Sequence, residues 1–262
     1  MKNLRVYGKA PYSVAVIHGG PGAPGSIAPV ASELSKDIGV LEPLQTKASV
    51  EGQVKELHDV LVRYAETPVN LVGHSWGAWL SCIVAARYPE IVKKLILISS
   101  GPFEEKYAAG ITAERLNRLS ENERVGVFKL IDVINGDAAG EKDQAMARFG
   151  ETMAEADTYA PLPPETEPEP MPASEEINRK VWAEAQQLRV SGELLEMGWK
   201  IKCPVVAIHG DYDPHPAEGV KAPLSRVLKD FRFILLKKCG HEPWREKYAR
   251  QEFFKVLRDE IK

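Results

Sequence analysis

The chain has 262 residues, of which 44% are hydrophobic and 27% charged, a mix typical of a globular protein. A formal net charge of −3 gives no field that attracts nucleic acid or an anionic membrane, so neither is expected as a partner. Three widely spaced cysteines form no metal-ligand pattern, and we expect neither a secretory leader nor a membrane span. These features favour a protein of a reducing compartment, the cytoplasm.

Short apolar runs alternate with helical patterns along the chain, which predicts a mostly parallel sheet flanked by helices. Ser49 is the expected N-cap of the second helix, whose apolar stripe is predicted from helical spacing. That stripe comprises Val54, Leu57, Val60, Leu61 and Tyr64. In chain order, we expect a strand at 13–20, a helix at 26–36, a strand at 39–44, a helix at 50–66, a strand at 69–75, a helix at 76–88, strands at 92–100, 203–211 and 231–240, and a helix at 245–262.

Residues 102–195 break this alternation. They contain helical patterns at 112–134 and 177–190 and no convincing strand. The segment 160–176, "APLPPETEPEPMPASEE", is rich in proline and acid, which favours an extended, solvated loop. The expected organisation is therefore an α/β core, formed by residues 1–101 and 196–262, with an α-helical insertion at 102–195.

One stretch, "LVGHSWGAWL", places Ser75 between two glycines where a predicted strand meets a predicted helix. A very tight strand-to-helix turn makes its apex residue stand clear at the carboxyl edge of the sheet. The residues two positions away approach too closely for a Cβ, which explains Gly73 and Gly77. We therefore predict that Ser75 is a nucleophile; the alternative is a tight turn that merely contains serine.

A second glycine-rich loop, "HGGPG" at 18–22, directly follows the first predicted strand. Its glycines let backbone amides turn inward, and proline stiffens it. An oxyanion hole needs two N–H groups that converge on one oxygen, and one comes from the residue after the nucleophile. We predict that Trp76 and Gly20 supply them, and that His18 organises the loop rather than reacts.

Two later loops supply a candidate acid and base. In "HGDYDPHP" at 209–216, Asp213 is favoured as the acid and Asp211 competes, because the strand must clear the sheet before its loop can turn toward a histidine. In "CGHEPW" at 239–244, His241 is the expected general base. His215 is its rival, but it lies only two residues from Asp213.

The order Ser75, Asp213, His241, each after a predicted strand, resembles the α/β-hydrolase family. The resemblance covers essentially all of the chain outside the insertion, and "HGGPG" with a tryptophan after the serine is most similar to the proline iminopeptidase branch. It implies an α/β-hydrolase fold in which the insertion is a helical cap over the pocket. The chain departs from that branch at 41–49, where "LEPLQTKAS" replaces an Asp-Gln-Arg-Gly loop, and it has little sequence before residue 13 for the first antiparallel strands.

The expected chemistry is two-step acyl transfer on a small or medium carboxylic ester or amide, with no metal or cofactor. An aminopeptidase is the first alternative, in which Glu104 or Glu105 would bind the substrate ammonium. An acyltransferase whose pocket excludes water and a non-catalytic scaffold are the others.

Overall fold

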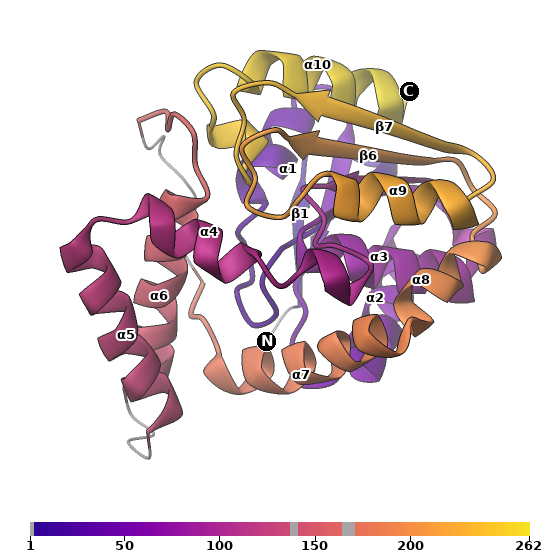
Figure 1. Cartoon of the computed structure of the whole chain (residues 1–262). Helices are drawn as coiled ribbons and strands as arrows, with labels where there is room; N and C mark the ends of the chain where they lie inside the picture. Colours follow the sequence, from indigo (N-terminus) through magenta and orange to yellow (C-terminus); the bar gives the residue numbers. More distant parts are fainter. Residues whose placement is uncertain (1–2, 137–140, 164–170) are drawn as a thin grey trace.

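A seven-stranded, mostly parallel sheet forms the centre of the molecule (Figure 1). The structure is a computed structural model, and it describes residues 3–136, 141–163 and 171–262. The strand order is β1-β3-β2-β4-β5-β6-β7, and every neighbouring pair is parallel except β1 and β3. The strands are β1 (Leu4–Tyr7), β2 (Tyr12–Ile17), β3 (Gly39–Pro43), β4 (Val69–His74), β5 (Val92–Ile98), β6 (Val205–Gly210) and β7 (Phe231–Leu236). The predicted α/β class and parallel sheet are confirmed.

The sheet contains one strand that the sequence did not predict. The residues Leu4–Tyr7, which precede the first predicted strand, form β1. This strand pairs antiparallel with β3, from Leu4 opposite Pro43 to Tyr7 opposite Val40. The Tyr7 hydroxyl donates a hydrogen bond to the buried Glu42 carboxylate at 2.7 Å. This short segment is enough to cover the outer edge of β3.

Helices cover both faces of the sheet, as continuously apolar parallel strands require. Leu71 and Leu95 pair across β4 and β5 and pack in one core cluster, while their neighbours Val72 and Ile96 pack in the other. The first cluster includes residues of α2, α3 and α9, and the second includes residues of α1 and α10. These helices are α1 (Ala28–Leu34), α2 (Val50–Tyr64), α3 (Trp76–Arg87), α9 (Glu218–Val227) and α10 (Arg250–Ile261).

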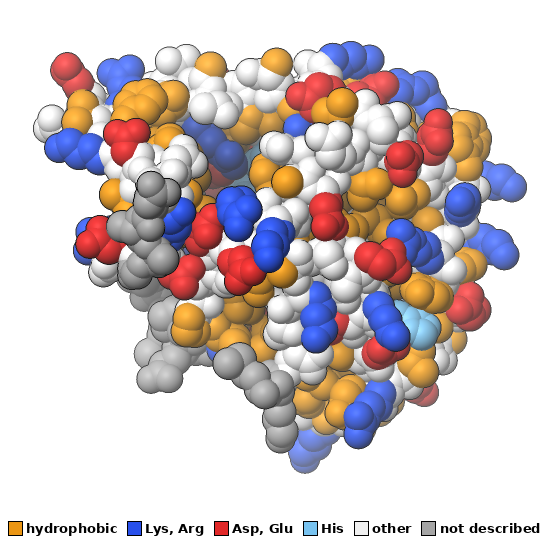
Figure 2. Space-filling model, turned by 90° about the horizontal axis from the view of Figure 1, so that it is seen from below, with side chains coloured by type: hydrophobic (Ala, Val, Ile, Leu, Met, Phe, Trp, Pro, Cys, Tyr) orange, Lys and Arg blue, Asp and Glu red, His pale blue; other side chains and the backbone are white. Residues whose placement is uncertain are grey.

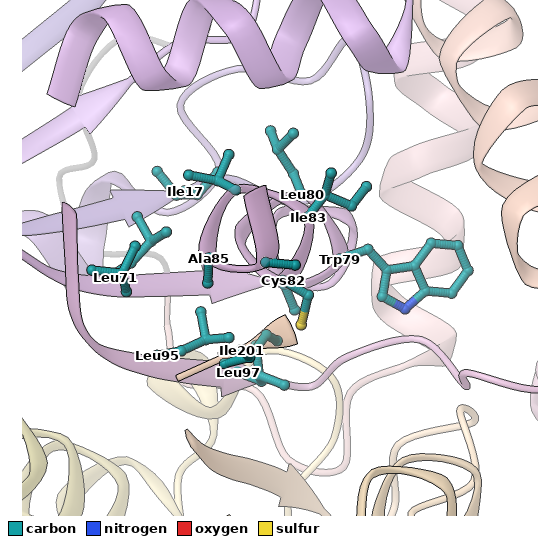
Figure 3. Close-up of a cluster of buried hydrophobic side chains, with 14 of the residues drawn as sticks. Ile17, Leu71, Trp79, Leu80, Cys82, Ile83, Ala85, Leu95, Leu97 and Ile201 are labelled. Atoms are coloured by element: carbon teal, nitrogen blue, oxygen red, sulfur yellow. The ribbon is translucent and has the colours of Figure 1, made fainter. Parts of the chain in front are cut away.

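The helix α3 is buried along nearly its whole length. Cys82 and Ala85 face Leu95 and Leu97 of β5 in this cluster (Figure 3). The position of α3 therefore fixes where Trp76, its first residue, and the turn before Trp76 meet the sheet.

The helix α2 begins as predicted, because the Ser49 hydroxyl accepts a hydrogen bond from the Gly52 N–H at 3.1 Å. Its predicted apolar stripe is buried except at Tyr64, which ends the helix and is 45% exposed.

Residues 102–195 lie between β5 and β6 and are called the inserted segment below; they contain helices that lie partly beside the sheet and partly beneath it (Figure 1). The helical pattern at 112–134 forms two helices, since Ser120 and Glu123 make a capping box that starts a new one. Residues 164–170 of the predicted proline-rich loop lie outside the described residues. The helices are α4 (Ile111–Arg118), α5 (Glu121–Asn135), α6 (Lys142–Ala156), α7 (Glu175–Ser191) and α8 (Glu193–Glu196). Among the described residues, no helix is long and apolar enough to span a membrane.

The helix α7 docks on the core through aromatic stacking. Its Trp182 lies parallel to Trp79 of α3, with ring centroids 5.7 Å apart and planes 4° apart. The Arg189 guanidinium lies 5.5 Å from the Trp79 ring, and Val181 and Ala185 are buried. This contact joins the inserted segment to the helix that follows Ser75.

Candidate active site

A strained turn joins β4 to α3 and carries Ser75 at its apex. Ser75 has φ 52° and ψ −115°, in a region that non-glycine residues seldom adopt. Its N–H donates to the Ile98 carbonyl at 3.0 Å. A Cβ on Gly73 would lie 2.3 Å from the Gly77 carbonyl oxygen, and a Cβ on Gly77 would lie 2.3 Å from the Ile17 carbonyl oxygen. The turn thus leaves no room for side chains at either glycine.

The loop after β2 lies directly against this turn. A Cβ on Gly19 would lie 3.1 Å from the Ser75 Cβ, and Gly20 has φ +53°. His18 is buried; its Nδ1–H donates to the Gly19 carbonyl at 2.8 Å and its Nε2 accepts from the Gln45 N–H at 3.2 Å. Burial lowers the pKa of His18 to about 4, so its imidazole is neutral and fixed within the loop.

Trp76 is held in place by its own side chain. The indole N–H donates to the buried Gln53 Oε1 at 3.0 Å. Because Trp76 is the first residue of α3, its backbone N–H has no partner inside the helix. That donor is therefore available at the end of the helix that lies next to Ser75.

Asp213 binds two imidazoles at once. Its Oδ2 accepts from the His241 Nδ1–H at 2.8 Å, and its Oδ1 accepts from the His215 Nδ1–H at 2.8 Å and the His215 backbone N–H at 3.0 Å. Asp211 instead accepts from the Cys239 N–H at 3.3 Å and pairs with Lys237 at 3.6 Å. Of the two carboxylates that the sequence left open, Asp213 is the one that contacts His241.

The two imidazoles on Asp213 have opposite pKa shifts, although their rings lie 4.6 Å apart. Burial lowers the pKa of His215 to about 4, which outweighs the neighbouring carboxylate. Burial also acts to lower the pKa of His241, but the charge of Asp213 and its hydrogen bond outweigh it and raise that pKa above 6.5. Burial opposes ionisation of Asp213, but the charges of His241 and His215 bring its pKa well below the usual range. His241 is thus the stronger base.

Other backbone and imidazole contacts hold the loops that carry these residues. The His74 Nε2–H donates to the His241 carbonyl at 3.0 Å, and burial lowers the pKa of His74 so that it stays neutral. The His209 Nε2–H donates to the His215 carbonyl at 2.8 Å. No role was assigned to His74 or His209 from the sequence. His74 directly precedes Ser75 and His209 lies near the end of the predicted strand 203–211, and these positions were the available signal that both lie near the site.

A cavity of about 910 Å³ opens at this edge of the sheet, and four of the five predicted residues line it: Gly20, Ser75, Trp76 and His241. Asp213 lies behind the wall, bound to His241 and to His215, which also lines the cavity. Figure 2 shows a hollow between the inserted helices and the body of the molecule, with basic and histidine side chains inside. Apolar side chains of α4, α5 and α6 form much of the remaining wall: Ile111, Ile131, Ile134, Met146, Phe149 and Met153.

Most charged groups of the cavity are paired; Glu151 of α6 also lines it, and no ion pair of Glu151 occurs among the described residues. Arg115 donates to both carboxylate oxygens of Asp157, at 2.8 and 2.6 Å, and Arg245 lies 3.1 Å from Glu242. The carboxylates suggested for a substrate ammonium are elsewhere. Glu104 pairs with Arg226 and Lys106, Glu105 pairs with Arg189, and neither lines the cavity.

The start of α7 fastens the glycine-rich loop. The Ser174 N–H donates to the Gly22 carbonyl at 2.8 Å, and the Asn178 side-chain amide donates to the Pro21 carbonyl at 2.9 Å. A Cβ on Gly22 would lie 2.3 Å from the Ser174 carbonyl oxygen. The inserted segment therefore contacts the loop that contains Gly20.

Among the described residues, only Asp213, His215 and His241 bring metal-ligating atoms together, within 4.8 Å of one another. Both imidazoles donate Nδ1–H to the carboxylate, so those nitrogens carry protons and the carboxylate oxygens already have donors. This arrangement fits an acid that orients a base better than it fits a metal site.

A family model described as the alpha/beta hydrolase fold matches residues 12–247. The chain belongs to the α/β hydrolase fold family. A search of curated proteins finds no match. Solved structures similar to this α/β hydrolase include VinJ (18% identity, 98% of this chain and 93% of that chain, TM-score 0.68) and E-2-(acetamidomethylene)succinate hydrolase (20%, 98% and 94%, TM-score 0.63). The enol-lactonase from Burkholderia xenovorans LB400 is also similar (18%, 98% and 94%, TM-score 0.59), and at these identities the likeness shows the fold alone.

The close approach at Gly77 predicts a large cost for one methyl group. Gly77→Ala should lower the free energy of unfolding by about 1–3 kcal/mol or more, because the new Cβ must displace the backbone at Ile17. Gly126→Ala is the matched control: a Cβ in the middle of α5 meets nothing within 4 Å and should raise stability by about 0.5–1 kcal/mol. Urea denaturation of both variants measures the difference, and equal effects would contradict the packing described.

The separation of the imidazole pKa values predicts an NMR titration. His241 should titrate with a midpoint above 6.5, and His18 and His215 with midpoints of about 4. Asp213→Asn should move the His241 midpoint downward, because the carboxylate charge that raises it is lost. A His215 midpoint above that of His241 would reverse the assignment of the base.

Proposed function

We propose that this α/β hydrolase is a serine hydrolase that cleaves small or medium carboxylic esters or amides through an acyl-enzyme on Ser75. The observation that carries the proposal is the Asp213–His241 hydrogen bond behind the wall of the cavity in which Ser75 stands on a strained turn. Membership of the family supports a hydrolase. The names of two similar structures, a hydrolase and a lactonase, are in keeping with such chemistry on this fold.

In the proposed first step, the His241 Nε2 takes the proton of the Ser75 hydroxyl as its oxygen attacks the acyl carbonyl. Asp213 accepts from the Nδ1–H, which keeps the imidazole in the required tautomer and stabilises its positive form. The N–H groups of Gly20 and Trp76 are proposed to donate to the oxyanion, a contribution typically of about 10²–10³ in rate per donor. The imidazolium then protonates the leaving alcohol or amine as the acyl bond to it breaks.

In the proposed second step, His241 takes a proton from water, and the resulting hydroxide attacks the acyl-enzyme. The tetrahedral intermediate collapses, Ser75 regains its proton from the imidazolium, and the carboxylic acid leaves. The raised pKa of His241 suits this role, because a stronger base takes the proton more readily.

We further propose that residues 102–195 act as a cap over a core formed by 1–101 and 196–262, and that the cap receives the apolar part of the substrate. Support comes from the apolar side chains that α5 and α6 contribute to the cavity, of which Met146 and Met153 adapt readily to different shapes. A cytoplasmic location is proposed on the three free cysteines.

An ester or a neutral amide is favoured over an aminopeptidase substrate. Glu104 and Glu105 are paired outside the cavity, and Asp157 and Glu242 inside it are paired with arginines. To bind any of these four carboxylates, a substrate ammonium would have to break an existing ion pair. Glu151 of α6 lines the cavity without an ion pair among the described residues, so it is the carboxylate that an aminopeptidase would use. Faster hydrolysis of a prolyl p-nitroanilide than of p-nitrophenyl acyl esters would favour the aminopeptidase instead.

Replacing the proposed nucleophile tests the function directly. Ser75→Ala should reduce p-nitrophenyl ester hydrolysis by about 10⁴-fold or more, because no acyl-enzyme can form. The variant should also lose labelling by a fluorophosphonate probe while keeping its circular dichroism spectrum. Wild-type rates in Ser75→Ala, or an unlabelled Ser75 in the folded wild type, would place the chemistry elsewhere or exclude it.

The two candidate carboxylates should differ sharply. Asp213→Asn should lower kcat/KM by about 10⁴-fold, since Asn no longer holds the required tautomer of His241. Asp211→Asn should have a far smaller effect, since Asp211 contacts the Cys239 N–H and Lys237 and not His241.

The pH dependence follows from the same pair. The base must be neutral, so kcat/KM of the wild type should rise with pH and level off above the raised pKa of His241, with a midpoint above 6.5. In Asp213→Asn that midpoint should fall, because the charge that raises it is gone. A larger loss of kcat/KM in Asp211→Asn than in Asp213→Asn would show instead that Asp211 is the acid.

A further inference from the structure

A buried carboxylate joins the inserted segment to the loop that carries His241. Glu246 is fully buried, and its Oε1 accepts from the Gly240 N–H and the Tyr159 N–H, each at 2.7 Å. Its Oε2 accepts from the Ala160 N–H at 2.8 Å. One of these donors therefore belongs to the residue directly before His241, and the other two belong to the segment that follows α6.

The two segments also bind each other through their backbones. The His241 N–H donates to the Asp157 carbonyl at 2.9 Å, and the Lys247 N–H donates to the Ala160 carbonyl at 2.8 Å. Pro161 and Glu246 form an antiparallel bridge. The contact is close, since a Cβ on Gly240 would lie 1.9 Å from the Asp157 carbonyl oxygen.

The segment 157–161 is in turn bound to another helix of the insertion, α4. Arg115 of α4 donates two hydrogen bonds to the Asp157 carboxylate, whose backbone carbonyl binds His241. A continuous series of contacts thus runs from α4 through Asp157 to the backbone of the proposed base.

A carboxylate suits this junction for a physical reason. Buried backbone N–H groups without partners are costly, and so is a buried carboxylate without donors. Two oxygens with several acceptor sites can satisfy N–H groups of two chain segments together, and charge-assisted hydrogen bonds are stronger than neutral ones. An apolar side chain of the same size would leave all three donors unsatisfied.

We propose that Glu246 is a positioning residue, which keeps the His241 imidazole in register with Ser75 by tying residues 157–161 to residues 240 and 241. The inference rests on the proposed function insofar as His241 is the base. Its consequence is that the insertion does more than cover the pocket: docking of the 157–161 segment is a condition for correct placement of the base.

The test compares Glu246→Ala and Glu246→Gln with the wild type. Gln keeps the shape and one oxygen acceptor, but it loses the charge and turns an NH₂ group toward a donor. Glu252→Gln is the matched control, because Glu252 is an exposed carboxylate in the first turn of α10. Glu246→Gln also keeps the proposal testable if Glu246→Ala does not fold.

The first measurement needs no substrate. Hydrogen–deuterium exchange should speed up by about tenfold or more in the peptides covering 157–162 and 239–242 together, more in Glu246→Ala than in Glu246→Gln, as local opening becomes easier. Glu252→Gln should exchange like the wild type. Faster exchange in 239–242 alone, with 157–162 still protected, would overturn the coupling.

The second measurement is kcat for p-nitrophenyl ester hydrolysis per fluorophosphonate-titrated site, which counts only folded, competent protein. It should fall about tenfold to a hundredfold, with KM near the wild-type value, because misplacing a reacting group by about 1 Å costs that much. Glu246→Gln should retain more activity than Glu246→Ala. An unchanged kcat per site would make Glu246 merely structural. Absence of turnover in the wild type would refute the proposed function, while the exchange result would still decide the coupling.

Discussion

The close contact between β4, α3 and β2 is the constraint on which the rest of the site depends. Neither Gly73 nor Gly77 has room for a Cβ, since each would lie 2.3 Å from a carbonyl oxygen. The backbone at Ser75 must therefore turn within one residue, at a cost of about 1–3 kcal/mol in strain. This turn places Ser75 at the carboxyl edge of the sheet, beside the N–H of the first residue of α3, which has no partner inside that helix.

Around Ser75, burial and hydrogen bonding give similar side chains different properties. Asp213 contacts both His215 and His241, yet burial prevails in the pKa of the first, while at the second the charge and the hydrogen bond of the carboxylate together outweigh burial. Pairs of titratable groups whose environments move their pKa values apart point to their separate roles. His215 becomes a neutral donor that fixes one oxygen of Asp213, and the other oxygen is left for His241.

The strands other than β1, the Ser75 turn and the Asp213–His241 pair could be predicted from the sequence, because each depends on local spacing and on strand ends that meet at one edge. Contacts between distant segments could not. Glu246 lies six residues from Gly240 but 86 and 87 from its other two donors, a separation that no local pattern encodes. The strand β1 likewise depends on which edge of the sheet needs a partner.

The inserted segment fastens two sides of the same cavity: α7 binds the loop of Gly20, and the segment after α6 binds the loop of His241. The proposed function requires these loops to converge on Ser75 as the nucleophile, with His241 as base and Gly20 as one of the oxyanion donors. A crystal structure of the protein after reaction with a fluorophosphonate tests it most directly. We expect phosphorus bound to the Ser75 oxygen, with a phosphonyl oxygen accepting from the N–H groups of Gly20 and Trp76. An adduct on another residue, or a phosphonyl oxygen turned away from both amides, would contradict it.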